Sequence, residues 1–407
     1  MLFAAADFSL RVTSMPPTSA ETSIGPTSTV SAMTHSTPRT PLPTLSRLLR
    51  SLGAAALVFG TVASLAAEPP QAPSGNLRLF VSGHSLTDNP VGEYITQIAS
   101  SMGTPARYNQ QIVIGSPIRA RTHGQGSWSG YRQGKNRSGS DIDVLGELRS
   151  GKEIGGDRYN VLLITERHDL LGPLIWEDTV RQLRHFHERA HDANPAVQTY
   201  LYTSWWGIKD MANPQTWVQY EREADQAWQC IATRINTSLI HENRPDRIRQ
   251  IPAAAALAAL VDRSTRQQLP GFSQADVKAT MGQLFTDDVH LTRAGAYYVA
   301  LVSYATIYGR SPVGAWSPSG VGAAQAKALQ SVAWDFLSPS TPPAKPLTLA
   351  QCNSYMVKTF CEASGNFVSK GDAGTINGCK QRFSQSGPDN PLSFDAQRDA
   401  AHWHPAP

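Results

Sequence analysis

The chain has 407 residues, of which 41% are hydrophobic and 17% charged, and its formal net charge is +4. This length suits one large domain with an appendage or two ordinary domains, and the composition excludes a chain that is disordered throughout. No block of lysine and arginine resembles a nucleic-acid-binding arm or a polybasic membrane patch, so we expect no nucleic-acid partner.

The first 67 residues are expected to lie outside the folded domain. Residues 1–32 are rich in Ser, Thr and Pro and lack periodicity, which predicts disorder. Residues 47–67 combine two arginines, an apolar run and a small-residue end, a pattern typical of an export signal. The apolar run is shorter than the roughly 20 residues that a spanning helix needs. We therefore predict cleavage near Ala66 or Ala67 and an exported (periplasmic or secreted) mature chain without a stable membrane span, with an uncleaved anchor as the alternative.

From residue 70 to about residue 337, short apolar runs alternate with longer helical patterns, which is typical of a parallel α/β sheet. The predicted strands are residues 77–82, 111–114, 160–165, 198–203 and 247–251. The predicted helices are residues 91–102, 141–150, 175–193, 215–240, 252–262, 292–308 and 321–337. Sheets of this kind place their sites at the carboxyl ends of the strands, so functional residues are expected just after each strand.

Aromatic residues follow two of these strands. Residues 115–140 form a long glycine-rich stretch that contains Trp128, and loops of this length are typically functional or disordered. Trp205 and Trp206 come directly after the fourth predicted strand. We interpret the three tryptophans as substrate-binding residues at the rim of a cleft, where indole rings stack on sugars; packing is the alternative for Trp205 and Trp206.

All four cysteines follow the predicted signal: Cys230, Cys352, Cys361 and Cys379. Their spacing matches no zinc or haem signature, and thiols oxidise in exported proteins. We predict a disulfide within the tail, and the sequence leaves its pairing open. Cys230 lies in a predicted helix and is interpreted as a candidate for a buried free thiol. Residues 338–346 are interpreted as a Pro-rich linker and residues 347–407 as a small disulfide-containing appendage.

A serine, a histidine and a carboxylate stand at predicted strand ends. Ser85 follows the first strand by three residues, where a strand-to-helix turn exposes its hydroxyl; a helix cap is the alternative. Asp287 and His290 lie three residues apart before the last helix of the domain, a spacing at which a carboxylate reaches Nδ1 of the imidazole. An imidazole that takes the serine proton, itself oriented by a carboxylate, makes the hydroxyl nucleophilic. We predict this triad, with Asp288 as the alternative carboxylate.

The string GHSLTD, residues 83–88, resembles the first block of the SGNH/GDSL hydrolase family, whose usual form is GDSLTD. The stretch DDVHLTRAG, residues 287–295, is similar to the last block of the family. The resemblance implies a three-layer α/β/α (flavodoxin-like) domain over residues 70–337 with a central five-stranded parallel sheet. It also implies that Ser85 is the nucleophile, His290 the base and Asp287 the residue that orients His290. His84 stands where the family usually has Asp.

The resemblance further implies an oxyanion hole with three donors. The backbone N–H of Ser85 is the first, and Gly115, directly after the second predicted strand, offers the second. The family's Gly-x-Asn-Asp block is replaced here by Glu166-Arg167-His168-Asp169, which puts His168 at the asparagine position. A neutral imidazole donates one N–H, so His168 is the predicted third donor. Glu166 becomes a candidate for substrate binding, and a structural charge network at the strand end is the alternative.

The function that the resemblance implies is an exported serine esterase that acts through an acyl-enzyme and needs no metal or organic cofactor. An O-acetylated polysaccharide is the expected substrate, with a lipid or a simple carboxylic ester as the alternative. Two other functions stay open: a sugar O-acyltransferase that uses the same triad, and a catalytically silent carbohydrate-binding protein of the cell envelope.

Overall fold

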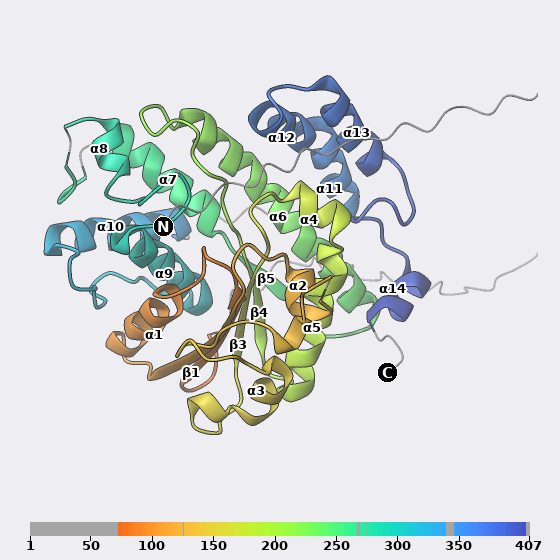
Figure 1. Ribbon diagram of the computed structural model, residues 1–407, viewed down its shortest axis with the longest axis horizontal. Coiled ribbons are helices and arrows are strands. Elements are labelled where there is room, and N and C mark those ends of the chain that lie inside the picture. Colours follow the sequence, from red (N-terminus) through yellow and green to blue (C-terminus); the bar gives the residue numbers. More distant parts are fainter. Residues whose placement is uncertain (1–71, 125, 267–268, 274, 339–345, 404–407) are drawn as a thin grey trace, which may run out of the picture. The chain divides into compact units, whose positions relative to one another are not determined.

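The computed structural model describes residues 72–403 except 125, 267–268, 274 and 339–345, so the predicted export signal and nearly all of the predicted linker lie outside the described residues. The described chain is built around five parallel strands in the order β2-β1-β3-β4-β5. The strands are β1 (Leu77–Gly83), β2 (Ala106–Ile112), β3 (Val161–Thr165), β4 (Gln198–Tyr202) and β5 (Ile248–Ile251). Helices flank the sheet on both sides (Figure 1), which confirms the predicted α/β/α fold.

Most helices of this domain lie close to their predicted positions. They are α1 (Val91–Ser101), α2 (Ile118–Thr122), α3 (Val144–Ser150), α4 (Leu171–Trp176), α5 (Thr179–Ala193), α6 (Gln215–His241), α7 (Ala253–Arg266), α8 (Val277–Met281), α9 (Arg293–Tyr308) and α10 (Ala323–Leu337), with the 3₁₀ turns η1 (Gly130–Arg132) and η2 (Lys152–Ile154). In the part of the chain that the structure covers, none of the helices combines the length and apolar character needed to cross a membrane.

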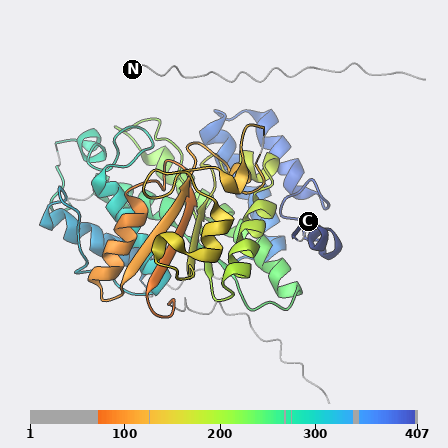
Figure 2. The same cartoon turned by 60° about the horizontal axis from the view of Figure 1, so that its bottom comes forward.

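The strands are buried because helices cover both faces of the sheet. α1 packs against α9 on one side, and α5 and α6 lie on the other, as the two views of Figures 1 and 2 show. Every residue of β3 is buried, which explains its unbroken apolar sequence. α5 buries Val180, Leu183 and Phe186, which recur at helical spacing along one face.

The second strand was predicted at the wrong place: it covers residues 106–112, not 111–114. The apolar pair Val113-Ile114 suggested a strand, whereas the true strand carries polar residues that are buried. Gln111 is satisfied inside the protein, because its amide donates to the carbonyl of Gln133 at 2.9 Å and its Oε1 accepts from Ser82 Oγ at 2.9 Å. Because Gln111 has these partners, its burial costs little, and the strand needs no apolar side chain at this position.

The predicted long loop, residues 115–140, contains the short helix α2 and the turn η1. Arg121 of α2 is fully buried and reaches the ends of two strands. Its guanidinium donates to Ser82 Oγ at 2.6 Å, to Ser116 Oγ at 3.0 Å and to the carbonyl of Thr165. These bonds fix the loop on the carboxyl edge of the sheet.

Residues 346–403, here called the C-terminal segment, are helical. The elements are α11 (Leu349–Tyr355), a π-helical turn η3 (Met356–Phe360), α12 (Cys361–Val368), α13 (Ala373–Ser384) and α14 (Ala396–Trp403). α11 and α12 lie against α6 (Figure 1), where Phe367 stacks on Tyr220 with ring centroids 4.5 Å apart. The segment therefore shares a core with the sheet domain.

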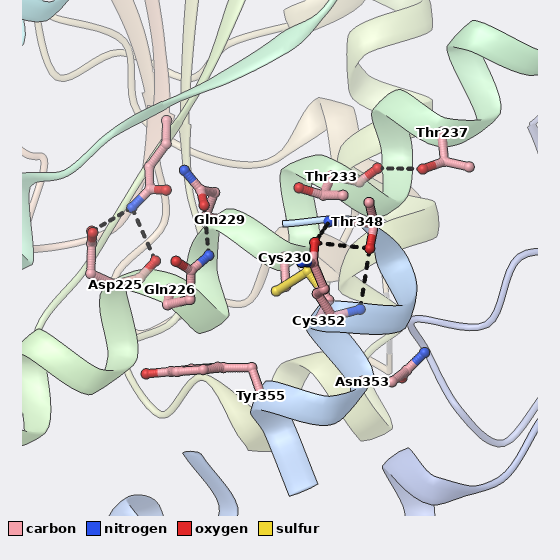
Figure 3. The surroundings of a disulfide bond; sticks show 12 residues. Asp225, Gln226, Gln229, Cys230, Thr233, Thr237, Thr348, Cys352, Asn353 and Tyr355 are labelled. Carbon is pink, nitrogen blue, oxygen red and sulfur yellow. Dashed lines mark hydrogen bonds between the residues drawn. A yellow bond between two sulfur atoms is a disulfide. The ribbon is translucent and has the colours of Figure 1, made fainter. Parts of the chain in front are cut away.

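Two disulfides hold this segment. Cys361 and Cys379 join α12 to α13, which confirms the predicted disulfide within the tail. Cys230 of α6 is bonded to Cys352 of α11 (Figure 3), so the interpretation of Cys230 as a free thiol is wrong. Sequence spacing does not reveal this pair because 122 residues separate the two cysteines and only the packing of α11 on α6 brings them together.

Candidate active site

Ser85 lies in a tight turn that ends β1. The N–H of Thr87 donates to the carbonyl of His84 at 2.9 Å, which closes the turn. A Cβ at Gly83 would lie 1.7 Å from Thr87 Oγ1, so only glycine allows the chain to fold back this closely. The turn leaves Ser85 partly exposed at the carboxyl edge of the sheet.

His84, which replaces the usual Asp of the resembled motif, anchors this turn from inside the protein. Burial, helped by the charge of Arg121, lowers the pKa of His84 to about 3, so the imidazole is neutral at ordinary pH. Its Nε2–H donates to the carbonyl of Glu166 at 3.1 Å, and its Nδ1 faces the N–H of Leu86 at 3.4 Å. The serine turn is thereby tied to the end of β3.

The histidine loop, residues 285–291, is closed by an antiparallel bridge between Phe285 and Leu291 just before α9. Asp287 Oδ1 accepts from the N–H of Val289 at 2.9 Å and from the N–H of His290 at 2.6 Å. A carboxylate that closes its own turn in this way is fixed in place. This turn aims the second oxygen of Asp287 at the imidazole.

The structure brings Ser85, His290 and Asp287 together in one chain of hydrogen bonds. Ser85 Oγ lies 3.1 Å from His290 Nε2, and His290 Nδ1 lies 2.8 Å from Asp287 Oδ2. Partial burial acts to raise the pKa of Asp287, but hydrogen bonds from His290 and Val289 outweigh it and hold this pKa below its ordinary value. An ionised carboxylate only accepts, so the neutral form of the His290 imidazole places its proton on Nδ1 and offers a free lone pair at Nε2 to the serine.

Asp288, the alternative carboxylate, has other neighbours. Its carboxylate lies beside Gly207, where an added Cβ would approach Asp288 Oδ2 to 2.8 Å. Its carbonyl accepts from the N–H of Ile208 at 2.7 Å. The residue joins the histidine loop to the loop after β4, and Asp287 rather than Asp288 contacts the imidazole.

Glu166 is not placed to bind a substrate, because its side chain is buried and fully engaged. Its Oε1 accepts from the N–H groups of Ile118 and Arg167, and its Oε2 accepts from Thr179 Oγ1 at 2.8 Å. Burial raises the pKa of this carboxyl, and the hydrogen bonds oppose the rise. The substrate-binding prediction for Glu166 is therefore wrong, and the residue braces the strand end.

Trp205 also differs from the prediction. It is 0% exposed, so a substrate at the rim does not reach its ring. Its indole N–H donates to the carbonyl of Val289 at 2.8 Å, and this bond holds the histidine loop against the interior of the protein. Nothing in the sequence distinguishes it from its neighbour Trp206, because only the fold decides which of two adjacent indoles points inward.

Trp206 and His168 form the partly exposed aromatic edge of the site. Their ring centroids are 5.0 Å apart in an edge-to-face arrangement. Burial lowers the pKa of His168, and the charges of Asp288 and His290 also act on it, so His168 lies within electrostatic reach of the triad. Its imidazole is neutral at neutral pH and keeps one N–H to donate.

The other two predicted oxyanion donors have free N–H groups. Neither the N–H of Ser85 nor that of Gly115 has a partner among the described residues. Gly115 is exposed with φ 68°, a left-handed conformation that favours glycine. It lies three residues beyond β2, not directly after it, and the N–H of Val113 donates to the carbonyl of Gly83, which holds its loop beside the serine turn.

Trp128 lies between α2 and η1 and is partly exposed. It makes no hydrogen bond or ring contact to the triad in the residues that the structure describes. Sequence reasoning missed Arg121, the buried cation behind the serine turn, since an arginine in a polar stretch carries no signal of burial. Across the described ranges, no group of three or more His, Cys, Asp or Glu is arranged to hold a metal ion.

No protein-family model matches the sequence, and no curated protein matches it. Among solved structures, the chain is similar to a DUF4886 family protein from Bacteroides uniformis, with a TM-score of 0.46 and 12% sequence identity over 68% of this chain and 99% of that chain.

Proposed function

We propose that this chain is an exported serine esterase of the SGNH/GDSL type, which hydrolyses carboxylic esters through an acyl-enzyme. The observation that carries the proposal is the hydrogen-bonded chain from Ser85 Oγ through His290 to Asp287, with distances of 3.1 Å and 2.8 Å. These lie within the range at which a base takes a proton from a nucleophile and is itself oriented.

In the proposed reaction, His290 Nε2 takes the proton of Ser85 as Oγ attacks the ester carbonyl. Asp287 stabilises the imidazolium that forms. His290 then returns the proton to the leaving alcohol, and a water molecule activated by the same nitrogen releases the acid from the acyl-enzyme. The free N–H groups of Ser85 and Gly115 and the neutral imidazole of His168 are the proposed donors to the oxyanion.

Hydrolysis rather than acyl transfer is favoured by the openness of the triad. The side chains of His290 and Asp287 are 45% and 51% exposed, so water reaches the base directly. A transferase must keep water from the acyl-enzyme, and such exposure works against that. An O-acetylated sugar is the proposed substrate, because the partly exposed edge of Trp206 and His168 offers an apolar face to a sugar ring beside the reacting groups.

The test is hydrolysis of p-nitrophenyl acetate by the wild type and by Ser85→Ala. We expect a loss of about 10⁴-fold or more in kcat/KM, because the variant has no nucleophile. Ser127→Ala, which removes an exposed serine outside the triad, is the matched control and should retain full activity.

A fluorophosphonate probe should label the wild type at Ser85, as read by peptide mass spectrometry. Equal rates for Ser85→Ala and the wild type would rule out the enzyme.

A further inference from the structure

A pocket of about 290 Å³ opens where the loop after β4 meets the C-terminal segment. Both parts contribute polar groups that face it. The residues used below are Lys209, Asn213 and Thr216 from the loop and the start of α6, and Asn366, Phe367 and Lys370 from the C-terminal segment. We call this the lysine pocket. The proposed reaction uses none of its residues.

The two ammonium groups of the pocket have no carboxylate partner. In the described chain, neither Lys209 nor Lys370 takes part in an ion pair. Lys209 Nζ donates to the carbonyl of Phe367 and lies 4.6 Å from the centre of its ring, which fixes the ammonium at the pocket. Among the described residues that line the pocket, Asp210 is the one acid, and its Oδ1 accepts from the N–H groups of Ala212 and Asn213.

The second lysine lies in a turn of unusual backbone conformation. Lys370 has φ 53°, a left-handed conformation that favours glycine, in the short connection between α12 and α13. The disulfide between Cys361 and Cys379 ties these two helices together. The stacking of Phe367 on Tyr220 of α6 then holds the connection against the sheet domain. Lys370 is thus presented by a braced turn.

The pocket lining is hydrogen-bonded to the histidine loop, which carries two of the triad residues. Ile208, on the pocket lining, donates its N–H to the carbonyl of Asp288 at 2.7 Å, and Asp288 stands between Asp287 and His290 in the histidine loop. The pocket contains no triad residue, so a group bound in it belongs to a part of the substrate that extends beyond the reacting ester. A polymer meets this condition, whereas a simple ester does not.

We infer that the lysine pocket binds a carboxylate-bearing sugar unit of a polysaccharide whose neighbouring unit carries the ester, an inference that rests on the proposed function. Lys209 and Lys370 attract the carboxylate, and the amides of Asn213 and Asn366 with the hydroxyl of Thr216 match sugar hydroxyls, which both donate and accept. The C-terminal segment thereby acquires a role: it forms one wall of the substrate site.

The test measures acetate release from O-acetylated polygalacturonate and from the same polymer with its carboxylates methyl-esterified. The wild type should show a kcat/KM about tenfold higher on the charged polymer, and added salt should reduce the difference.

The double variant Lys209→Gln/Lys370→Gln should lose this preference through KM, with p-nitrophenyl acetate hydrolysis unchanged. Lys370→Gln alone should lose part of it and avoids disturbing the contact of Lys209 with Phe367. Lys358→Gln, an exposed lysine of the same segment outside the pocket, is the matched control.

Affinity electrophoresis of Ser85→Ala in gels containing polygalacturonate separates this inference from the proposed function, because it reads binding without catalysis. Retardation of Ser85→Ala that disappears in the triple variant with both lysines changed supports the pocket. Absence of retardation, or equal kcat/KM on the charged and methylated polymers, overturns the inference even if p-nitrophenyl acetate is hydrolysed. Retardation without any ester hydrolysis overturns the proposed function and leaves the pocket as a binding site for acidic polysaccharide.

Discussion

At the scale of single residues, the adjacent aspartates of the histidine loop have separate tasks. Asp287 binds the imidazole, and Asp288 joins its loop to the loop after β4. Asp287→Asn should lower kcat/KM on p-nitrophenyl acetate by up to about 10⁴-fold, because an amide in place of the carboxylate favours the wrong tautomer of His290. The measurement is a steady-state assay with the melting temperature as a check on folding.

Asp288→Asn is the matched control for this change. Its carboxylate does not contact the imidazole, so kcat/KM should stay within about threefold of the wild type, well short of the loss expected when a triad residue is changed. If Asp288→Asn loses as much activity as Asp287→Asn, the assignment of the triad carboxylate is wrong.

His84 makes the stability of the protein depend on pH. The pKa of His84 is about 3 in the folded protein and 6.5 as the ordinary value, so the unfolded chain takes up a proton on this side chain first as the pH falls. The stability from the neutral, buried imidazole is therefore fully present above pH 6.5 and is lost as the pH falls from there toward 3. The slope for one such group is about 1.4 kcal/mol per pH unit.

His84→Gln should remove this contribution, because glutamine does not titrate and its amide also donates to the carbonyl of Glu166. Urea unfolding of both proteins between pH 7 and pH 4 gives the difference in stability. We expect the wild type to lose stability relative to the variant across this interval, and parallel curves would show that His84 takes up its proton in the folded protein.

At the scale of elements, the bond between α6 and α11 should contribute more to stability than the bond between α12 and α13. Cross-linking restricts the unfolded chain more when the closed loop is longer, and the separations are 122 and 18 residues. The chain-entropy relation gives about 4–5 kcal/mol for the first and about 3 kcal/mol for the second. Paired Cys→Ala variants measured by urea unfolding should follow this order.

Alanine is the suitable replacement at Cys230 and Cys352 because both are 0% exposed, and serine would bury an unpaired hydroxyl. Each double variant keeps the other disulfide, so the two double variants serve as controls for each other. A greater loss for the pair Cys361 and Cys379 would mean that the unfolded chain already holds α6 and α11 together.

Sequence patterns predicted the elements whose burial is purely apolar. β3 falls within one residue of its expected bounds because helices on both faces demand a continuous apolar run. β2 was placed wrongly because its buried Gln111 is satisfied by hydrogen bonds that form only in the folded protein. An element is thus predictable to the degree that its own side chains, and not distant partners, account for its burial.

At the scale of the whole molecule, the sequence predicted which residues meet but not how they are supported. Ser85 and His290 are 205 residues apart, and two short motifs with a strand-end rule sufficed to place them together. The supports behind them were not assigned: Arg121 was missed, and a structural role for Glu166 and for Trp205 was only the alternative, because the roles of buried polar and aromatic side chains depend on contacts from several elements. The pairing of Cys230 with Cys352 was not predicted either, because it too depends on contacts between elements that are distant in the sequence.

The disulfide pattern has a consequence for how the chain matures. In chain order the cysteines pair first with second and third with fourth. Four cysteines allow three pairings, and under the proposed export this is the one produced when each thiol is oxidised with the next to emerge from a translocation channel, N-terminus first. An oxidase that acts on the arriving chain therefore yields the native bonds directly. Maturation should need a thiol oxidase and proceed without a disulfide isomerase.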